Sequence, residues 1–426
     1  MIEGVIALAV LVLVVMAGMR LVYAILFSVA LHLVLTGAWP LSLPQQMVSG
    51  MNGWILLALP LFVFAGGLMN ASGLSERIID LARALVGRFP GGLAQVNVLD
   101  SMFFGGVIGT SVADLAGTGT IIIPAMKKDG YPGPFAAALT ATSSGIGPLI
   151  PPSSPMILYA AVTGTSLGAL FLAGVVPGVL LGLSMMVIVA VLARRHGWQP
   201  IMRFSGRLVW QTGKAASWAF GVPVIIVAGL VFGVFTPTES GAFAVLYALI
   251  VALFIYKTVS LKDLYRVLID AAALTGEVML IVGLSVALGW TMSRARIPGA
   301  LANIIDSVVP GENALLRITA MVVLAILAGM VLDPLIPVIV PIILPTLLAF
   351  DVDLIHFGIL MVMTVVIGQV TPPVAMSLLV AGKIAKEDLY DVFKANVPFL
   401  FVMVVMLVAL IAIPELSTWL PSVFRP

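Results

Sequence analysis

The chain has 426 residues, of which 61% are hydrophobic and only 9% are charged, with a formal net charge of +2 and a mean hydropathy of +1.20. This composition excludes a soluble globular protein and indicates a polytopic α-helical membrane protein. The chain has no cysteine, so disulfides, thiolate chemistry and sulfur-ligated metals are excluded as well.

Apolar stretches close to the ~20 residues that cross a bilayer recur along the whole chain. The first lacks a basic n-region and a small-residue cleavage site, so we expect a membrane span there and not a signal peptide. We expect residues 1–52 to form scaffold spans. The stretches are 5–19, 21–39, 53–69, 167–193, 215–235, 240–256, 272–292 and 395–413.

The basic residues predict a topology. If the N-terminus lies outside and two later hairpin-like segments do not cross, 17 of the 21 Lys and Arg residues fall inside. The positive-inside rule supports this arrangement. A topology in which each hairpin arm crosses would change the layout between the hairpins, so the rule does not by itself prove that they are re-entrant.

A first repeat is predicted over residues 53–163. It opens with the span 53–69, and an amphipathic arm at 73–88 follows, with apolar residues on one helical face and charged residues opposite. Glycine and polar residues interrupt 93–126, leaving arms of about 13–15 residues that are short for a crossing, which favours a re-entrant hairpin. The last segment, 132–163, is an apolar helix broken by a Pro-Pro pair.

A second repeat, residues 272–385, is predicted to follow the same order. Scaffold spans at 164–271, with a polar loop at 195–214, separate it from the first, and a C-terminal arm and span at 386–426 follow it. The topology makes the two repeats inverted. The second repeat contains the span 272–292, an arm at 297–309, a hairpin at 313–350 and a broken helix at 354–382.

The two broken helices contain related sequence motifs, and this repetition is the strongest functional signal in the chain. Residues 147–156 include Pro151-Pro152, and residues 368–376 include Pro372-Pro373. Proline removes a backbone donor and stops a helix, so each pair unwinds its span. Freed carbonyls are tolerated in a membrane where they line a cavity or bind a ligand. Broken helices at matching places in two halves indicate the binding site of a secondary transporter.

Each break has a candidate ion-binding partner in the preceding hairpin. The polar tip Gly109-Thr110-Ser111 precedes Gly147 and Pro152, and Gly329 precedes Gly368. Backbone carbonyls and hydroxyls suit a hard cation such as Na+. The alternative is that glycine and serine only allow close helix packing in lipid; the duplication favours the ion sites.

One isolated acid lies in each hairpin. Asp114 and Asp333 fall in apolar surroundings, where an ionised carboxylate is costly and indicates a functional site. The alternative is a helix-capping role near the start of the second hairpin arm, and both roles are compatible.

A carboxylate substrate fits the space between the breaks. No Lys or Arg lies in a predicted membrane core segment, and helix N-termini with free amides bind carboxylates without a basic residue. The expected substrate is a small organic acid, the expected environment is a lipid bilayer, and nucleic acid is not an expected partner. Candidate substrate contacts are Thr110, Ser111, Ser153, Ser154, Gln369, Thr371 and Pro372.

One further motif is structural. Thr236-Pro237-Thr238-Glu239 has the pattern of a capping box with proline at the first helical position. It predicts the start of the span at 240–256.

Several blocks in the same order give the chain a family resemblance. They are Ala65-Gly66-Gly67-Leu68-Met69, residues 109–114, residues 146–153, Phe235-Thr236-Pro237-Thr238-Glu239, Ile355-His356-Phe357-Gly358-Ile359 and residues 367–374. With them the sequence resembles the large membrane subunit of tripartite ATP-independent periplasmic (TRAP) transporters over essentially its whole length. The departures include Thr364 where asparagine is usual and Ala375 where glycine is usual.

The resemblance implies a Na+-driven elevator importer, with a scaffold and a moving transport domain, in the bacterial inner membrane and with a periplasmic N-terminus. It implies two partners, a small four-helix membrane subunit and a soluble periplasmic substrate-binding protein, and C4-dicarboxylates as one substrate class. It implies two or more Na+ sites. Their ligands map to Ile108, Thr110, Gly147 and Pro152 in the first repeat, and to Gly329, Gly368, Thr371 and Val374 in the second.

Other functions compete with this interpretation. A stand-alone Na+/dicarboxylate symporter of the same superfamily would share the hairpins and breaks but need no binding protein. An intramembrane enzyme would need a catalytic motif such as His-Glu-x-x-His, and direct ATP drive would need a phosphate-binding loop; the chain has neither. A passive channel would be expected to show polar pore-lining stripes.

Overall fold

The computed structural model describes residues 1–309 and 313–424, except for the side chains of residues 106–108 and 113. All regular elements within these ranges are helical, as predicted. Six helical segments are long and apolar enough to cross a membrane, from Trp54–Ala71 to Leu389–Ala412. The prediction of an all-α polytopic membrane protein is thereby confirmed.

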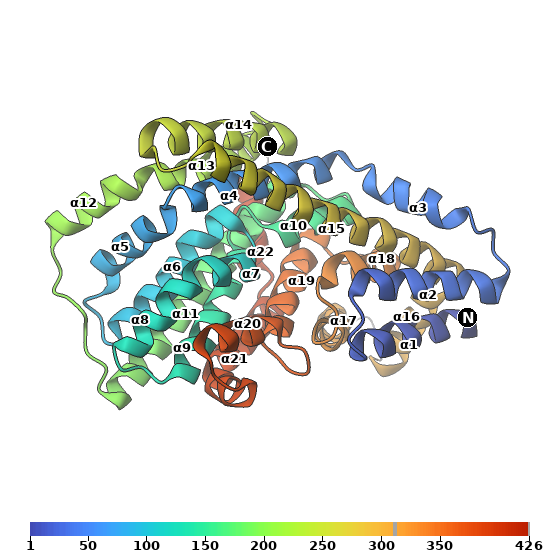
Figure 1. Cartoon of the computed structure of the whole chain (residues 1–426). Coiled ribbons are helices and arrows are strands. Elements are labelled where there is room, and N and C mark those ends of the chain that lie inside the picture. Colours follow the sequence, from blue (N-terminus) through green and yellow to red (C-terminus); the bar gives the residue numbers. More distant parts are fainter. Residues whose placement is uncertain (310–312, 425–426) are drawn as a thin grey trace.

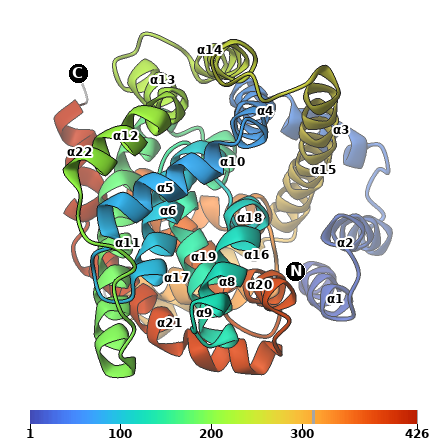
Figure 2. The ribbon, with the colours of Figure 1, turned by 60° about the vertical axis from the view of Figure 1, so that its left-hand side comes forward.

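The N-terminal helices lie at the edge of the molecule (Figure 2). Helices α1 and α2 pack against each other, and α3 packs on the long helix α15. A 3-10 turn, Trp54–Leu57, leads into α4. These helices are α1 (Ile2–Met16), α2 (Leu21–Thr36), α3 (Ser42–Met51) and α4 (Ala58–Ala71).

The first repeat continues as an amphipathic helix, a bent hairpin and a broken helix. Helix α5 (Leu74–Val86) buries its apolar face against α6. The hairpin consists of α6 (Gly92–Ile108), the short α7 (Ser111–Asp114), a π-helical turn (Leu115–Gly119) and α8 (Thr120–Lys128). The broken helix consists of α9 (Gly133–Ser143), the 3-10 turn Ser144–Leu149 and α10 (Ser154–Thr163).

Between the repeats lie α11 (Leu167–His196), α12 (Gly206–Ala216), α13 (Gly221–Val231) and α14 (Pro237–Ile250). The prediction of a polar loop at 195–214 is wrong for its second half. Ser205 caps α12 by accepting from the Leu208 N–H at 3.4 Å, and α12 packs on α5. Its basic and polar residues lower the hydropathy, although its apolar residues share one face. The capping box of α14 is confirmed, with Thr236 and Glu239 bonded reciprocally.

Helix α15 (Leu261–Arg294) begins well before the predicted span at 272–292. A second capping box starts it: the Asp263 N–H donates to Ser260 Oγ at 3.2 Å, and the Ser260 N–H donates to Asp263 Oδ2 at 3.1 Å. The charged residues in the first turns lower the mean hydropathy, so the start of the helix could not be recognised from hydropathy alone. A repeat boundary at 271–272 therefore falls inside one continuous helix. Figure 1 shows α15 running from near α13 toward α2 and α3.

The second repeat has the same sequence of elements. Helix α16 (Ile297–Val308) precedes the hairpin of α17 (Ala314–Gly329) and α18 (Leu335–Ala349). The broken helix consists of α19 (Leu354–Gln369) and α20 (Met376–Ala385). The C-terminal helices are α21 (Leu389–Ala412) and α22 (Glu415–Phe424); α22, which packs on α11, was not anticipated beyond the span.

Contacts between the repeats join their hairpins and broken helices into one bundle. Helix α20 packs on α9, and α10 packs on α18. The Lys127 ammonium at the end of α8 lies 2.8 Å from Glu387 Oε1 and donates to the Ala385 carbonyl at 2.6 Å. At the opposite end, the Tyr159 hydroxyl of α10 donates to the Leu354 carbonyl at 2.8 Å. Each repeat thus contacts the other through its hairpin and its broken helix.

Candidate functional site

The first break is held by its own serine. After the 3-10 turn, residues 150–153 are not helical and bend at 150–152, and Pro151 and Pro152 contribute no backbone N–H. The Ser153 hydroxyl donates to the Pro148 carbonyl at 2.5 Å and accepts from the Met156 N–H at 3.3 Å, which caps α10. Ser153 therefore stabilises the unwound segment, while the half-buried Ser154 begins the next helix.

The tip of the first hairpin packs directly on this break. Gly109 has φ +70° and accepts a hydrogen bond from the Ser154 N–H at 3.3 Å. A Cβ at Gly109 would collide with the Pro152 carbonyl, and one at Gly105 would collide with the Gly147 backbone. The glycines therefore permit backbone-to-backbone contact. Helix α6 ends at Ile108, whose side chain is outside the described set.

The polar residues at this tip differ in their surroundings. Thr110 has extended backbone angles, φ −137° and ψ 139°, and is half-buried. Ser111 opens α7 and is only 2% exposed, and its hydroxyl has no hydrogen-bond partner among the described residues. The predicted first-site residues Thr110, Gly147 and Pro152 thus belong to two segments that are in contact.

The second break repeats the glycine contact. Helix α17 ends at Gly329, and a Cβ on Gly368 would lie 2.5 Å from the Gly329 carbonyl oxygen. A small cavity of about 10 Å³, room for roughly one water-sized guest, lies beside this contact. Its lining residues are Gly329, Val331, Asp333, Gly368, Gln369, Val374, Ala375 and Met376.

Thr371 and Pro372 do not line the cavity. The Thr371 hydroxyl donates to the Ile367 carbonyl at 2.6 Å, so it extends the end of α19. Three of the four predicted second-site residues, Gly329, Gly368 and Val374, therefore share one cavity. The Pro372–Pro373 bond is cis, as is the Pro151–Pro152 bond of the first break.

The two acids act as hydrogen-bond acceptors and not as helix caps. Asp114 Oδ1 accepts from the Thr118 hydroxyl at 2.8 Å, within the π-helical turn. The Asp333 carboxylate accepts from the Gln369 amide at 3.3 and 3.4 Å. Gln369, predicted as a substrate contact, thus connects the second hairpin to the second broken helix.

Two clefts flank the bundle on either side of α15. One, of about 830 Å³, lies between the α1–α2 turn, the middle of α15 and the second hairpin, and Arg20, Glu277, Asp333 and Val374 are in its wall. Asp333 and Val374 line the small cavity too, so this cavity adjoins the cleft.

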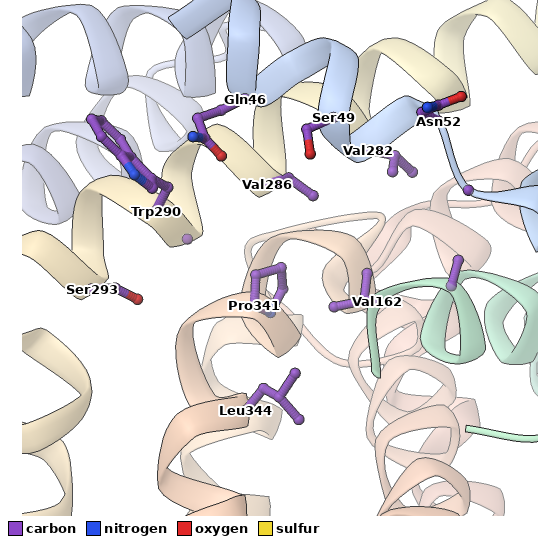
Figure 3. Close-up of a pocket in the computed structure, with 14 residues that line it drawn as sticks. Gln46, Ser49, Asn52, Val162, Val282, Val286, Trp290, Ser293, Pro341 and Leu344 are labelled. Carbon is purple, nitrogen blue, oxygen red and sulfur yellow. The ribbon is translucent and has the colours of Figure 1, made fainter. Parts of the chain in front are cut away.

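The other cleft, of about 410 Å³, is shown in Figure 3. Gln46 and Ser49 of α3 and Trp290 of α15 lie on one side, facing Pro341 and Val162 across the space. The polar side chains of this lining, Gln46, Ser49, Asn52 and Ser293, come from α3, the residue after it and α15, whereas α10 and α18 contribute only apolar residues. Scaffold and bundle are therefore incompletely packed at both places.

Comparison with known proteins identifies the family of the chain. Residues 5–416 match the family model described as the tripartite ATP-independent periplasmic transporter, DctM component. The chain belongs to this family. It is therefore a transporter permease of the multi-pass membrane class, and not an enzyme, as predicted.

Three relatives in this family are similar along most of their length. The sialic acid TRAP transporter large permease protein SiaM of Vibrio cholerae is 33% identical, with 96% of each chain covered. The 2,3-diketo-L-gulonate TRAP transporter large permease protein YiaN of Escherichia coli is 36% identical, covering 87% of this chain and 88% of that protein. The C4-dicarboxylate TRAP transporter large permease protein DctM of Pseudomonas aeruginosa is 34% identical, with 89% of each covered.

A solved structure shares the fold of this TRAP permease. The YdaH transporter of Alcanivorax borkumensis, reported to have an unusual topology, superposes with a TM-score of 0.58 and covers 87% of each chain. The sequence identity is 13%, so this likeness concerns the fold alone.

Asp100 and Asn396 are among the buried polar residues of this permease that the sequence analysis missed. Asp100 on α6 is fully buried and faces Asp114, so Asp114 is not the isolated acid that was expected. Asn396 on α21 is also fully buried; it accepts from the Thr142 hydroxyl and donates to the Val370 carbonyl at 3.1 Å. Each is a polar residue within an apolar stretch of the sequence, and this isolation is the feature by which the sequence could have indicated it.

Proposed function

We propose that this permease imports a small organic acid by Na+-coupled secondary transport, with an elevator movement of the bundle against the scaffold. One observation carries the proposal: each hairpin tip meets its broken helix through a glycine contact, Gly105 with Gly147 and Gly329 with Gly368. Both contacts lie next to proline-interrupted backbone, where carbonyl oxygens are free to bind a cation.

The substrate class is supported by the relatives and by the surroundings of the breaks. Sialic acid, 2,3-diketo-L-gulonate and C4-dicarboxylates, named for the relatives, are all carboxylates. In this chain a carboxylate would be bound by amides and hydroxyls near the breaks, because helix N-termini favour anions. The cleft that adjoins the second cavity would admit it, with Arg20 in the wall.

Na+ is the proposed coupling ion at two or more sites. Carbonyls beside Gly147, Pro152, Gly368 and Val374 are neutral oxygen donors, which suit a small hard monovalent cation. A cation bound there would order hairpin tip and break together and would lower the cost of binding an anionic substrate. The departures Thr364 and Ala375 do not remove a predicted ligand.

The elevator proposal rests on the connections within the bundle and on the two clefts at its border with the scaffold. Lys127 with Glu387, and Tyr159 with Leu354, join the two repeats. The two clefts lie between this bundle and α1–α3 with α15. We place the permease in the bacterial inner membrane with its N-terminus in the periplasm, by the distribution of basic residues.

The proposed partners are a small four-helix membrane subunit and a soluble periplasmic substrate-binding protein, as the family's tripartite description implies. Uptake into proteoliposomes tests the whole proposal. This chain would be reconstituted with the small subunit encoded in the same genome, and a panel of labelled organic acids would be supplied with the binding protein from that genome. We expect uptake of one acid that needs both the binding protein and an inward Na+ gradient.

The outcomes separate the alternatives. Uptake that needs Na+ but no binding protein would identify a stand-alone symporter, and uptake independent of Na+ would refute the coupling ion. Gly368→Ala places a Cβ 2.5 Å from the Gly329 oxygen, so we expect Na+-driven uptake to fall at least about tenfold. Thr371→Ala removes the hydroxyl that bonds the Ile367 carbonyl at the end of α19, beside Gly368, and should therefore weaken the Na+ dependence more than expression. Gly299→Ala on α16, where a Cβ meets nothing within 4 Å, is the matched control.

A further inference from the structure

The first hairpin brings two acids together below its tip. Asp100 on α6 and Thr118 in the π-helical turn each lie nine residues from Gly109, one before it and one after it. The two arms therefore place them at similar depth, and α6 packs on both α7 and α8, so that the Asp100 carboxyl lies near the Thr118 hydroxyl and the Asp114 carboxyl. Thr118 donates to Asp114 Oδ1 at 2.8 Å, so its hydroxyl lies between the two acids.

Both acids are cut off from water and incompletely bonded. Asp100 is 0% exposed and Asp114 is 1% exposed. Both carboxyl oxygens of Asp100, and Oδ2 of Asp114, lack a hydrogen-bond partner among the described residues. Burying a carboxylate without such partners is strongly unfavourable, and two neighbouring carboxylates repel each other as well.

An unpartnered hydroxyl lies on the same side of the hairpin. Ser111 is 2% exposed, its Oγ has no partner in the described part of the chain, and it precedes Asp114 by three residues on α7. Residues three apart share a helical face, so Ser111 and Asp114 lie on the same face of α7. The Ser101 hydroxyl also faces Asp114, although it donates to Ser143 Oγ at 3.1 Å.

No basic side chain balances the pair. None of the ion pairs found among the described residues involves Asp100 or Asp114. Lys127 and Lys128 lie at the far end of α8, about 13 Å along the helix from Thr118. A mobile positive charge is therefore needed for both acids to be ionised in this place.

We propose that Asp100 and Asp114, with the Thr118 hydroxyl between them, bind a Na+ ion inside the first hairpin. The donors are all oxygens, as a hard cation requires, and Na+ is the ion already proposed for the hairpin tips. The site is separate from the sites proposed at the hairpin tips: Asp100 is on the opposite arm from Thr110, about 13 Å of helix from Gly109.

Thermal unfolding of the full chain with its small subunit in nanodiscs tests the site. The melting temperature is followed by tryptophan fluorescence as NaCl replaces choline chloride at constant ionic strength. A cation bound only by the folded state raises the wild-type melting temperature by about 1–2 °C for each tenfold increase above its dissociation constant. We expect the Na+-dependent rise in melting temperature to be smaller in Asp100→Asn and in Asp114→Asn than in the wild type. Without Na+, each variant should melt at or above the wild-type temperature, because the repulsion between the two carboxylates is removed.

Controls separate the site from the tips and from general effects. Asp80→Asn, an exposed acid on α5, should keep the whole Na+ response. In Gly368→Ala, the share of the Na+-dependent rise in melting temperature that depends on Asp100 should remain, even if Na+-driven uptake fails. KCl, CaCl2 and MgCl2 should not replace NaCl.

Three results would overturn the proposal. One is an unchanged Na+ response in both single variants and in the double variant. The second is lower stability of all three than of the wild type without Na+, since this would mean that the acids have a structural role. The third is complete rescue of the wild type by acid alone, with no further gain from Na+, because a proton would then neutralise the pair.

Discussion

Asn396 connects the two broken helices, and its removal is the sharpest structural test of the site. The residue is fully buried on α21. Its amide donates to the Val370 carbonyl, which the second break frees from the α19 ladder, at 3.1 Å. Its oxygen accepts from the Thr142 hydroxyl, one residue before the end of α9. The substitution Asn396→Ala removes both bonds.

The expected cost follows from what each partner retains. Thr142 keeps its bond to the Ala138 carbonyl at 2.9 Å, so its hydroxyl is not orphaned. The Val370 carbonyl loses its side-chain donor in a buried position, which costs about 1–3 kcal/mol. Thr142→Val leaves the Asn396 oxygen unpaired instead, at a similar cost. Because each single variant already breaks the shared bond, the double variant should cost less than their sum, by about 0.5–3 kcal/mol.

Denaturation of the purified permease in detergent measures the stability changes, and Na+-driven uptake measures the functional change. Val370 lies between Gly368 and Thr371, so a carbonyl that moves should weaken the second ion site and raise the Na+ concentration needed for half-maximal uptake. Asn303→Ala, an exposed asparagine on α16, is the matched control. Stability of Asn396→Ala within about 0.5 kcal/mol of wild type, with unchanged Na+ dependence, would refute the reasoning.

Two further predictions concern contacts that join the segments. Gly105→Ala should destabilise the permease by about 1–3 kcal/mol, because its Cβ would collide with the backbone of the first break. The control Gly206→Ala should not destabilise it, because a Cβ there meets nothing within 4 Å. Equal losses of stability in denaturation would contradict the contact between Gly105 and the break. Lys127→Ala should lower the free energy of unfolding by about 1 kcal/mol, since the ion pair with Glu387 is partly exposed. This loss of stability should be smaller at high salt. A loss that does not depend on salt would mean that packing, and not the ion pair, is responsible.

The sequence predicted the helical interruptions because their cause is local. Proline cannot donate a backbone hydrogen bond, so Pro151 and Pro152, and likewise Pro372 and Pro373, end their helices wherever they occur. The capping box at Thr236 was readable for the same reason, since its partner lies three residues away. Hydropathy, by contrast, hid α12 and the first turns of α15, because charged residues on one face of an amphipathic helix lower the average.

Contacts between distant segments could not be read from the chain. Nothing near Gly105 in the sequence indicates that its backbone meets Gly147, and nothing near Gly329 indicates Gly368; these pairs are created by packing. Asn396 was overlooked because one amide barely changes the hydropathy of α21, although its position opposite a break gives it both of its partners.

The two hairpins have similar backbones but different charge. In the second, Asp333 accepts from the Gln369 amide and lines the 830 Å³ cleft, so its charge has a neutral donor and a path to water. In the first, Asp114 is buried and faces a second acid, Asp100. A carboxylate beside an amide can stay ionised by itself, whereas two buried carboxylates require a positive charge. With the elevator movement proposed above, the first hairpin therefore moves through the membrane at low cost only with a cation between its acids, and the second carries no such requirement.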